Sequence, residues 1–253
     1  MIQVKTFYAY NDLRNFSYLI YDDKTGESWV VDPFEARPMI DYIKKNSLVL
    51  NGILNTHQHF DHIRGNRPLK DAFGSPIRSL GNSEYIQLNP DFALESLATP
   101  GHTLDHQVFL LKEKNLVKAL FSGDTLFNAG VGNCKNGGDV NLLYETTMML
   151  MVALPADLLL YPGHDYIQKN LEFAQTLEPE NKCIQEALIK VKDQPIENRR
   201  AEKLGDDFKV NPYFRLNSQE IRQKLGVGVN SVEDAGELER DLFIKIRSLR
   251  DKW

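Results

Sequence analysis

The stretch "NTHQHFDHIRGN" at residues 55–66 constrains this chain more than any other. His57 and His59 are two positions apart and follow an apolar run, so on an extended segment their imidazoles share one face and can reach one ion. Asp61 and His62 are adjacent, point in different directions, and are better placed for a second ion. The stretch therefore predicts a metal site at the end of a strand.

Three later segments repeat a single design of an apolar run, a glycine and a residue that can bind metal. They end at Gly101-His102, Gly123-Asp124 and Gly163-His164. Glycine permits the tight turn needed where a strand leaves its sheet. Ligands at strand ends are held by a rigid scaffold and can converge on one edge of the sheet.

The candidate ligands outnumber the four of a closed tetrahedral zinc site. They are His57, His59, Asp61, His62, His102, Asp124 and His164. Such a set fits two ions about 3.5–4 Å apart with one bridging carboxylate. Five of the six histidines belong to this pattern, which argues against ordinary surface or core histidines. His106, the sixth, is expected to support a ligand or the fold.

Hydrophobic periodicity predicts an α/β domain followed by a helical one. The order β-β-α-β is expected at the start, and amphipathic helices are expected after residue 165. The predicted strands are 16–22, 28–33 and 48–56, the helices 36–46, 170–179, 181–193 and 231–253, and a loop with a short helix covers 211–225. We expect a catalytic domain over 1–168 and a helical substrate-binding domain over 169–253.

Composition narrows the class of protein and of partner. With 42% hydrophobic and 26% charged residues the chain is an ordinary globular one. It has no run of roughly 20 apolar residues and no signal-peptide pattern, so neither membrane insertion nor secretion is expected. A net charge of −5 argues against nucleic acid. Cys134 and Cys183 are expected to be reduced thiols in a cytoplasmic protein, a monomer or small homo-oligomer.

The motifs "THQHFDH", "TPGHT", "SGDTLF" and "YPGHDY", in this order, resemble the metallo-β-lactamase superfamily. The resemblance implies an α/β fold, the αβ/βα four-layer sandwich, here with a C-terminal α-helical domain. It also implies a dinuclear centre. One ion would take His57, His59 and His102, the other Asp61, His62 and His164, and Asp124 would bridge them. Imidazole and carboxylate donors suit zinc, our first expectation, and also iron or manganese.

Within the superfamily the chain is most similar to glyoxalase II, the hydroxyacylglutathione hydrolases, through "LPADLLLYPGHDY" and the helical tail ending in "RSLRDKW". The resemblance implies that the substrate-binding residues are Asn133, Lys135, Tyr166, Arg247 and Arg250. Asn133 stands where the family usually has a basic residue and Lys135 where it has an aromatic one. Asp105 replaces a usual glycine. Solvated side chains are the alternative interpretation for Lys135, Arg247 and Arg250.

The implied activity is hydrolysis of a small-molecule thioester, S-D-lactoylglutathione, to glutathione and a 2-hydroxy acid. A metal-bridging hydroxide would attack the carbonyl, and Asp61 would orient it. Alternatives are a mononuclear iron persulfide dioxygenase, whose arginine-bearing "GRTD"-like element is absent here, or a hydrolase of a lactone or non-glutathione ester or thioester. A scaffold with a degenerate site would lack ligands, and none of the seven is missing.

Overall fold

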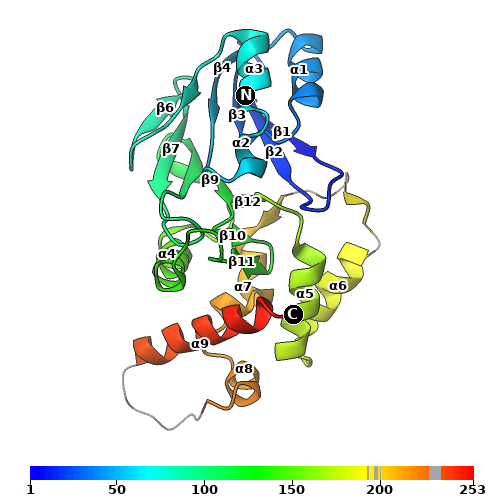
Figure 1. Cartoon of the computed structure of the whole chain (residues 1–253), viewed down its shortest axis with the longest axis vertical. Coiled ribbons are helices and arrows are strands. Elements are labelled where there is room, and N and C mark those ends of the chain that lie inside the picture. Colours follow the sequence, from blue (N-terminus) through cyan, green and yellow to red (C-terminus); the bar gives the residue numbers. More distant parts are fainter. Residues whose placement is uncertain (193, 197–198, 200, 228–234) are drawn as a thin grey trace. The chain divides into compact units, whose positions relative to one another are not determined.

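The computed structural model describes residues 1–192, 194–196, 199, 201–227 and 235–253, and divides into two compact units that alternate along the chain (Figure 1). Unit 1 comprises Met1–Ala98, Asp105–Gly123 and Tyr161–Asp165, and unit 2 comprises Thr99–Leu104, Asp124–Leu160 and Tyr166–Trp253. The domain boundary expected near residue 168 is a different division and stays a prediction. Among the described residues, no helix is both long and apolar enough to cross a membrane.

The first sheet of unit 1 is built from the N-terminal part of the chain. Its strands, in spatial order, are β1 (Ile2–Tyr8), β2 (Phe16–Asp22), β3 (Glu27–Val31), β4 (Val49–Leu54) and β5 (Ile77–Arg78). The first three are antiparallel neighbours, whereas β4 runs parallel to β3 and β5. The parallel pairs need crossover connections, which here contain helices.

Helices α1 (Ala36–Lys45) and α3 (Asn66–Phe73) pack against this sheet (Figure 1). Met39 and Ile43, four residues apart on α1, join Val30 and Ile53 of the sheet and Leu69 of α3 in one core. That spacing places both α1 side chains on one helix face. Burial of this apolar face fixes β4, whose end leads into the histidine cluster.

The second sheet of unit 1 stacks on the first through aromatic rings. Its strands, in spatial order, are β12 (Leu159–Pro162), β9 (Leu116–Gly123), β8 (Gln107–Glu113), β7 (Phe92–Ala98) and β6 (Tyr85–Gln87). The Tyr18 ring of β2 lies 5.3 Å from the rings of Phe121 and Tyr161. Helices, sheet and sheet thus form three consecutive layers within this unit.

Unit 2 is mainly helical. It holds β10 (Leu126–Phe127), β11 (Gly130–Val131), α4 (Val140–Ala153), α5 (Ile167–Leu177), α6 (Lys182–Lys192), β13 (Glu202–Lys203), α7 (Leu204–Val210), a 3₁₀ turn (Pro212–Phe214), α8 (Gln219–Lys224) and α9 (Ala235–Arg250). The β10–β11 hairpin leads into the segment with Asn133 and Lys135.

Most predicted elements are confirmed with shifted ends, although α5 begins at Ile167 rather than 170. The prediction missed several elements, among them the edge strand β1, the strand β8, the 14-residue helix α4 and the seven-residue helix α7. Residues 231–234 of the last predicted helix lie outside the described residues.

Replacing Ile43 by Ala should lower the free energy of unfolding of unit 1 by about 2–5 kcal/mol, because the fully buried side chain would leave a cavity. Urea denaturation followed by fluorescence of buried Trp29, in a Trp253→Phe background, measures this. Lys45→Ala, on the exposed face of the same helix, is the control and should change stability by less than about 0.5 kcal/mol. Equal effects would contradict this packing.

Candidate metal centre

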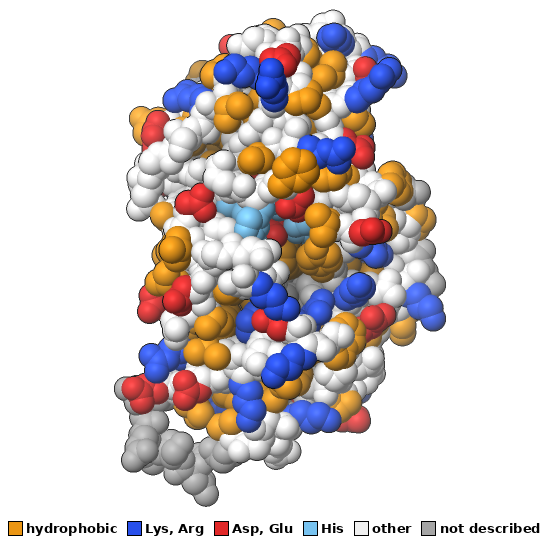
Figure 2. All heavy atoms as spheres, viewed as in Figure 1, with side chains coloured by type: hydrophobic (Ala, Val, Ile, Leu, Met, Phe, Trp, Pro, Cys, Tyr) orange, Lys and Arg blue, Asp and Glu red, His pale blue; other side chains and the backbone are white. Residues whose placement is uncertain are grey.

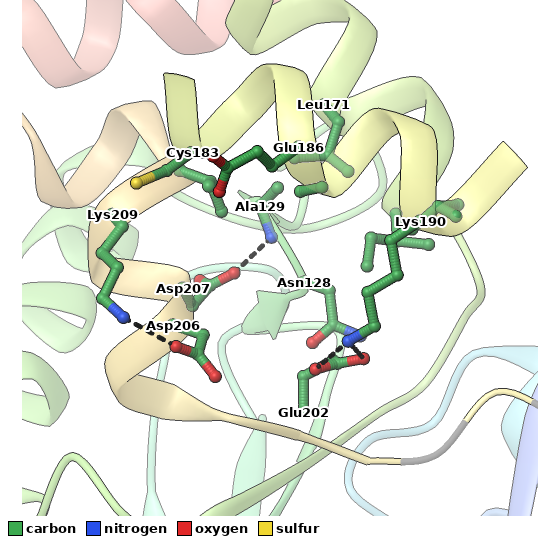
Figure 3. Close-up of a pocket in the computed structure, with 14 residues that line it drawn as sticks. Asn128, Ala129, Leu171, Cys183, Glu186, Lys190, Glu202, Asp206, Asp207 and Lys209 are labelled. Carbon is green, nitrogen blue, oxygen red and sulfur yellow. Dashed lines mark hydrogen bonds and ion pairs between the residues drawn. The ribbon is translucent and has the colours of Figure 1, made fainter. Parts of the chain in front are cut away.

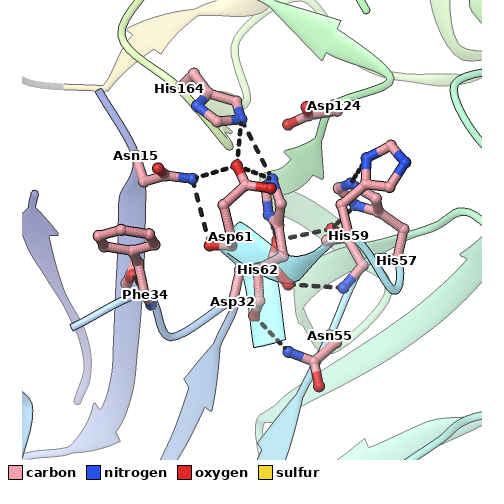
Figure 4. A network of polar contacts seen from close by, with 12 residues as sticks. Asn15, Asp32, Phe34, Asn55, His57, His59, Asp61, His62, Asp124 and His164 are labelled. Atoms are coloured by element: carbon pink, nitrogen blue, oxygen red, sulfur yellow. Dashed lines mark hydrogen bonds and ion pairs between the residues drawn. The ribbon is translucent and has the colours of Figure 1, made fainter. Parts of the chain in front are cut away.

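Three side chains of unit 1 turn their ligand atoms toward a common point (Figure 4). His62 and Asp61 lie in α2 (Phe60–Ile63), directly after the histidine-bearing turn, and His164 follows β12. The two Nε2 atoms are 3.2 Å apart, and Asp61 Oδ2 is 3.5 Å from His62 Nε2 and 3.4 Å from His164 Nε2. The predicted second-ion ligands of this unit are therefore brought together.

These separations fit a tetrahedral metal site. Two ligand atoms each about 2.0–2.1 Å from zinc, at the tetrahedral angle, lie about 3.3–3.4 Å apart. The observed separations of 3.2–3.5 Å bracket that value. Two imidazole lone pairs this close repel one another unless a cation or proton lies between them. The donor set therefore suits a divalent ion.

Each of these two imidazoles has an acceptor behind it. Asp32 Oδ2 lies 3.0 Å from His62 Nδ1, and the Leu13 carbonyl lies 2.7 Å from His164 Nδ1. A carbonyl can only accept, so His164 carries its proton on Nδ1. His62 likewise carries its proton on Nδ1, because the Asp32 carboxylate accepts a hydrogen bond there. Both rings thus present the Nε2 lone pair toward Asp61, the arrangement that metal ligation requires.

Asp32 also orients the other half of the histidine cluster (Figure 4). The Thr56 hydroxyl donates to Asp32 Oδ2 at 2.6 Å and lies 3.0 Å from His57 Nδ1. His57 Nε2 and His59 Nδ1 are 3.0 Å apart, so the two predicted first-ion ligands of unit 1 also converge. Asp32 is buried at the end of β3 with φ 50°, a conformation rarely adopted by side-chain-bearing residues.

The sequence interpretation missed Asp32, and it also missed Asn15. Its buried amide donates to Asp61 Oδ2 at 2.8 Å, which fixes the direction of this carboxylate (Figure 4). Asn15 also forms an antiparallel bridge with His164, and beside it Arg14 pairs with Asp165 at 2.8 Å. Residues 13–15 therefore orient two predicted ligands, His164 and Asp61, although their amino-acid types do not suggest metal chemistry.

His106 has the supporting position expected of it. Its buried ring stacks on His57 with ring centres 5.0 Å apart. Gly123 lies close to His106 and Thr56, with φ 49°, because a Cβ there would come within 2.9 Å of His106 Nε2 and 2.4 Å of Thr56 Oγ1. This glycine is therefore needed for the turn and for the close approach of the backbone.

Unit 2 carries the remaining two predicted ligands. His102 Nε2 lies 3.4 Å from Asp124 Oδ2, again a separation suited to one shared ion. His102 Nδ1 lies 2.6 Å from the Asn133 carbonyl oxygen, which assigns the proton to Nδ1. Each of the seven predicted ligands therefore has a ligand atom close to that of at least one other predicted ligand. Figure 2 shows histidine side chains at the surface, and His59 is half-buried rather than fully enclosed.

The five residues predicted to bind substrate lie together in unit 2. Asn133, Lys135, Tyr166, Arg247 and Arg250 all line one cavity of about 290 Å³. Its wall also includes Phe127, Asn170, Asp251 and Trp253. The structure thus brings together every residue expected to bind substrate, and three of them are cationic.

The cations of this cavity differ in how strongly they are engaged. Asp251 bonds Arg247 Nη2 at 2.9 Å, and its backbone carbonyl accepts from Lys135 Nζ at 3.1 Å. Arg250 stacks its guanidinium over Trp253, 5.2 Å from the ring centre. Burial, with the charge of Arg247, lowers the pKa of Arg250.

Cys134, in the same segment, has the character of an ordinary thiol. It is half-buried, and burial raises its pKa to about 11. At neutral pH it is therefore protonated and unreactive.

Comparison with known proteins identifies two family matches. Residues 165–253 match the family described as hydroxyacylglutathione hydrolase C-terminus, and residues 10–86 match the metallo-beta-lactamase superfamily. A hydroxyacylglutathione hydrolase of a Polaromonas species is 36% identical over 99% of both chains. The cytoplasmic hydroxyacylglutathione hydrolase of Arabidopsis thaliana is 32% identical over 94% of this chain and 95% of its own.

Solved structures agree on the fold. A metallo-beta-lactamase from Staphylococcus aureus superposes with a TM-score of 0.66 at 20% identity, covering 98% of this chain and 72% of its own. ETHE1 from Myxococcus xanthus gives 0.65 at 20% identity, covering 98% and 99%. The expected αβ/βα fold with a C-terminal helical domain is thereby confirmed.

Replacing Asp32 by Asn should weaken metal binding at the His62 site about 10–100-fold. Asp32 accepts from the Thr56 amide through Oδ1 and from the Thr56 hydroxyl and His62 through Oδ2, whereas an asparagine has only one acceptor oxygen for these three groups. Competition of the purified protein with a chromophoric zinc chelator measures this. Asp41→Asn, the same change on the exposed face of α1, is the control and should bind as the unaltered chain does. Unaltered affinity in Asp32→Asn would contradict the orienting role.

Proposed function

This chain belongs to the hydroxyacylglutathione hydrolase family of the metallo-beta-lactamase superfamily, and on that basis we propose that it hydrolyses S-D-lactoylglutathione to glutathione and a 2-hydroxy acid. It is a metal-dependent thioester hydrolase with a small-molecule substrate. The observation that carries this conclusion is the full-length likeness to these enzymes, joined to the clustering of Asp61, His62 and His164 at ligand spacing.

The centre that we propose holds two divalent ions. The first is bound by His57, His59, His102 and Asp124, the second by Asp61, His62, His164 and Asp124. Chain connectivity supports the participation of unit 2: Asp124 is bonded directly to Gly123, the last residue of β9. Zinc is the proposed metal, because imidazole and carboxylate donors at tetrahedral separations suit it, and iron and manganese would accept similar donors.

Bound ions of this kind supply a water of lowered pKa and a positive charge for the oxyanion that develops on the thioester carbonyl. The residues of the chain contribute orientation. Asp61 would accept a hydrogen bond from the attacking water through the oxygen not held by Asn15. Asn15, at 2.8 Å from Oδ2, keeps the carboxylate in one rotamer. The leaving thiolate is stable enough to depart without a strong general acid.

The cavity of unit 2 is the proposed site for the glutathione part. Tyr166 and Asn133 offer hydrogen bonds, and Lys135, Arg247 and Arg250 offer positive charge to its carboxylates. Arg250 is the cation best placed for this role. Its Nη2 makes only a long contact with Asn170, at 3.3 Å, whereas Asp251 already engages Lys135 and Arg247.

We further propose a cytoplasmic protein that acts as a monomer or small homo-oligomer and binds neither nucleic acid nor membrane. The name of the Arabidopsis relative supports this location. Both cysteines are unpaired by disulfide, as expected for reducing surroundings. A catalytic domain over 1–168 and a substrate-binding domain over 169–253 remain the proposed functional division.

The purified protein should contain two metal ions per chain and hydrolyse S-D-lactoylglutathione. Dialysis against a chelator should abolish the activity, and zinc should restore it, since the nucleophile depends on the ions. Elemental analysis and loss of absorbance of the thioester provide the measurements. A single iron with oxygen uptake on glutathione persulfide would instead indicate a dioxygenase. Hydrolysis of other esters or lactones alone would disprove the glutathione assignment and retain the hydrolase.

Replacing Arg250 by Met should raise KM for S-D-lactoylglutathione about tenfold or more with little change in kcat, because binding of a remote carboxylate stabilises ground and transition states alike. Steady-state kinetics test this. Lys252→Met removes an exposed positive charge two residues away and should leave KM within about twofold. A fall in kcat at constant KM would exclude a purely anchoring role.

A further inference from the structure

The backbone of residues 128–132, which includes β11 and leads into the loop with Lys135, is held by side chains of the helical part of unit 2. The Asn128 carbonyl accepts from Asn170 at 3.0 Å, and the Ala129 amide donates to Asp207 (Figure 3). The Gly130 carbonyl accepts from Asn211 at 3.2 Å. These contacts fix the hairpin itself.

Arg247 provides the last of these restraints. Its Nη1 donates to the carbonyls of Val131 at 2.9 Å and Gly132 at 3.3 Å. Its Nη2 bonds Asp251 at 2.9 Å, and its guanidinium lies over the Tyr213 ring at 5.8 Å. The side chain is 9% exposed. Both terminal nitrogens are therefore committed to partners within the protein.

The next carbonyl along the chain, that of Asn133, holds a proposed metal ligand. It lies 2.6 Å from His102 Nδ1, and His102 Nε2 faces Asp124 Oδ2 at 3.4 Å. Space here is tight: a Cβ on Gly132 would come within 1.9 Å of the Asp124 carbonyl oxygen. A small shift of this backbone would therefore move the acceptor away from the imidazole.

We propose that Arg247 is a positioning residue for His102: by holding the carbonyls of Val131 and Gly132, it keeps the Asn133 carbonyl where it fixes the ring and tautomer of His102. The inference rests on the proposed function in that His102 is taken as a ligand of the first ion. It replaces the substrate-binding role proposed above for Arg247 by a role at the metal centre, and it leaves the substrate carboxylate to Arg250.

A substrate anchor would need a different arrangement. Bidentate binding of a carboxylate uses two neighbouring guanidinium N–H groups in a fork. In Arg247 both terminal nitrogens already bond partners within the protein, Nη1 two carbonyls and Nη2 Asp251. In Arg250 the engaged terminal nitrogen is Nη2, which bonds Asn170 Oδ1 at 3.3 Å, a longer contact than those of Arg247 to Val131 and Asp251 at 2.9 Å. The two arginines, three residues apart on α9, therefore have different tasks.

The test uses three variants in the full chain. Arg247→Met removes the donors and the charge, and Arg247→Lys keeps the charge but cannot reproduce the planar fork that reaches two carbonyls. Arg250→Met removes a charge from the same cavity without touching the backbone of 131–133. Zinc titration against a chromophoric chelator gives the affinity of each ion. In the metal-free protein, ¹⁵N-histidine NMR follows exchange of the His102 Nδ1–H, assigned by its loss in His102→Gln.

In both Arg247 variants we expect zinc binding of one ion to weaken about 10–100-fold, the effect usual for loss of the groups that orient a ligand. The His102 Nδ1–H should exchange faster with solvent. Arg250→Met should keep both properties and change KM alone. Arg247→Lys also covers the case in which Arg247→Met does not fold.

Unchanged zinc affinity and proton exchange in a folded Arg247 variant, with KM raised as in Arg250→Met, would overturn the proposal and make Arg247 a substrate anchor. Zinc affinity and proton exchange do not depend on the substrate. Failure of the unaltered chain to hydrolyse the thioester would therefore disprove the proposed function and leave this test intact.

Discussion

Every imidazole that binds a metal through one ring nitrogen needs a fixed acceptor at the other, and much of this structure is organised around that requirement. Asp32 serves His62 directly and lies behind His57 through the Thr56 hydroxyl. The Leu13 carbonyl serves His164, and the Asn133 carbonyl serves His102. These acceptors come from the end of a strand, an N-terminal loop and a hairpin exit. Each element must be in place before its histidine offers the correct tautomer.

These buried polar contacts lower the stability of the metal-free protein and favour the metal-bound protein. Asp32 is 3% exposed and has a positive φ, both unfavourable for an aspartate taken alone. Its two oxygens are nevertheless satisfied by the Thr56 amide, the Thr56 hydroxyl and His62. The Nε2 atoms of His62 and His164 face each other at a distance that suits a cation between them. Metal binding should therefore stabilise the fold as well as create the reactive centre.

We propose two separate roles for the helical part of unit 2. Its cavity, lined by Arg250, Tyr166 and Trp253, has charge and aromatic surface and is the proposed site for a small anionic molecule. The side chains beneath, Asp207, Asn211 and Arg247, bind backbone groups of the hairpin and its exit. If the second task is as proposed, changes in this region alter metal retention and substrate binding separately, and a loss of activity alone cannot tell them apart.

The sequence by itself determined the chemistry of the ligands, their order and the strand-turn elements that carry them. This was possible because those signals are local: two histidines at spacing two, or a glycine before a ligand after an apolar run, are written within a few residues. Tertiary structure alone decided the contacts of Asp32 with His62, of Asn15 with Asp61 and of Arg247 with the hairpin. Asp32 meets His62 across 30 residues, and Leu13 meets His164 across 151. Every residue has a backbone carbonyl, so the amino-acid sequence does not distinguish one from another. Only the folded chain shows which carbonyl accepts a hydrogen bond from a given histidine.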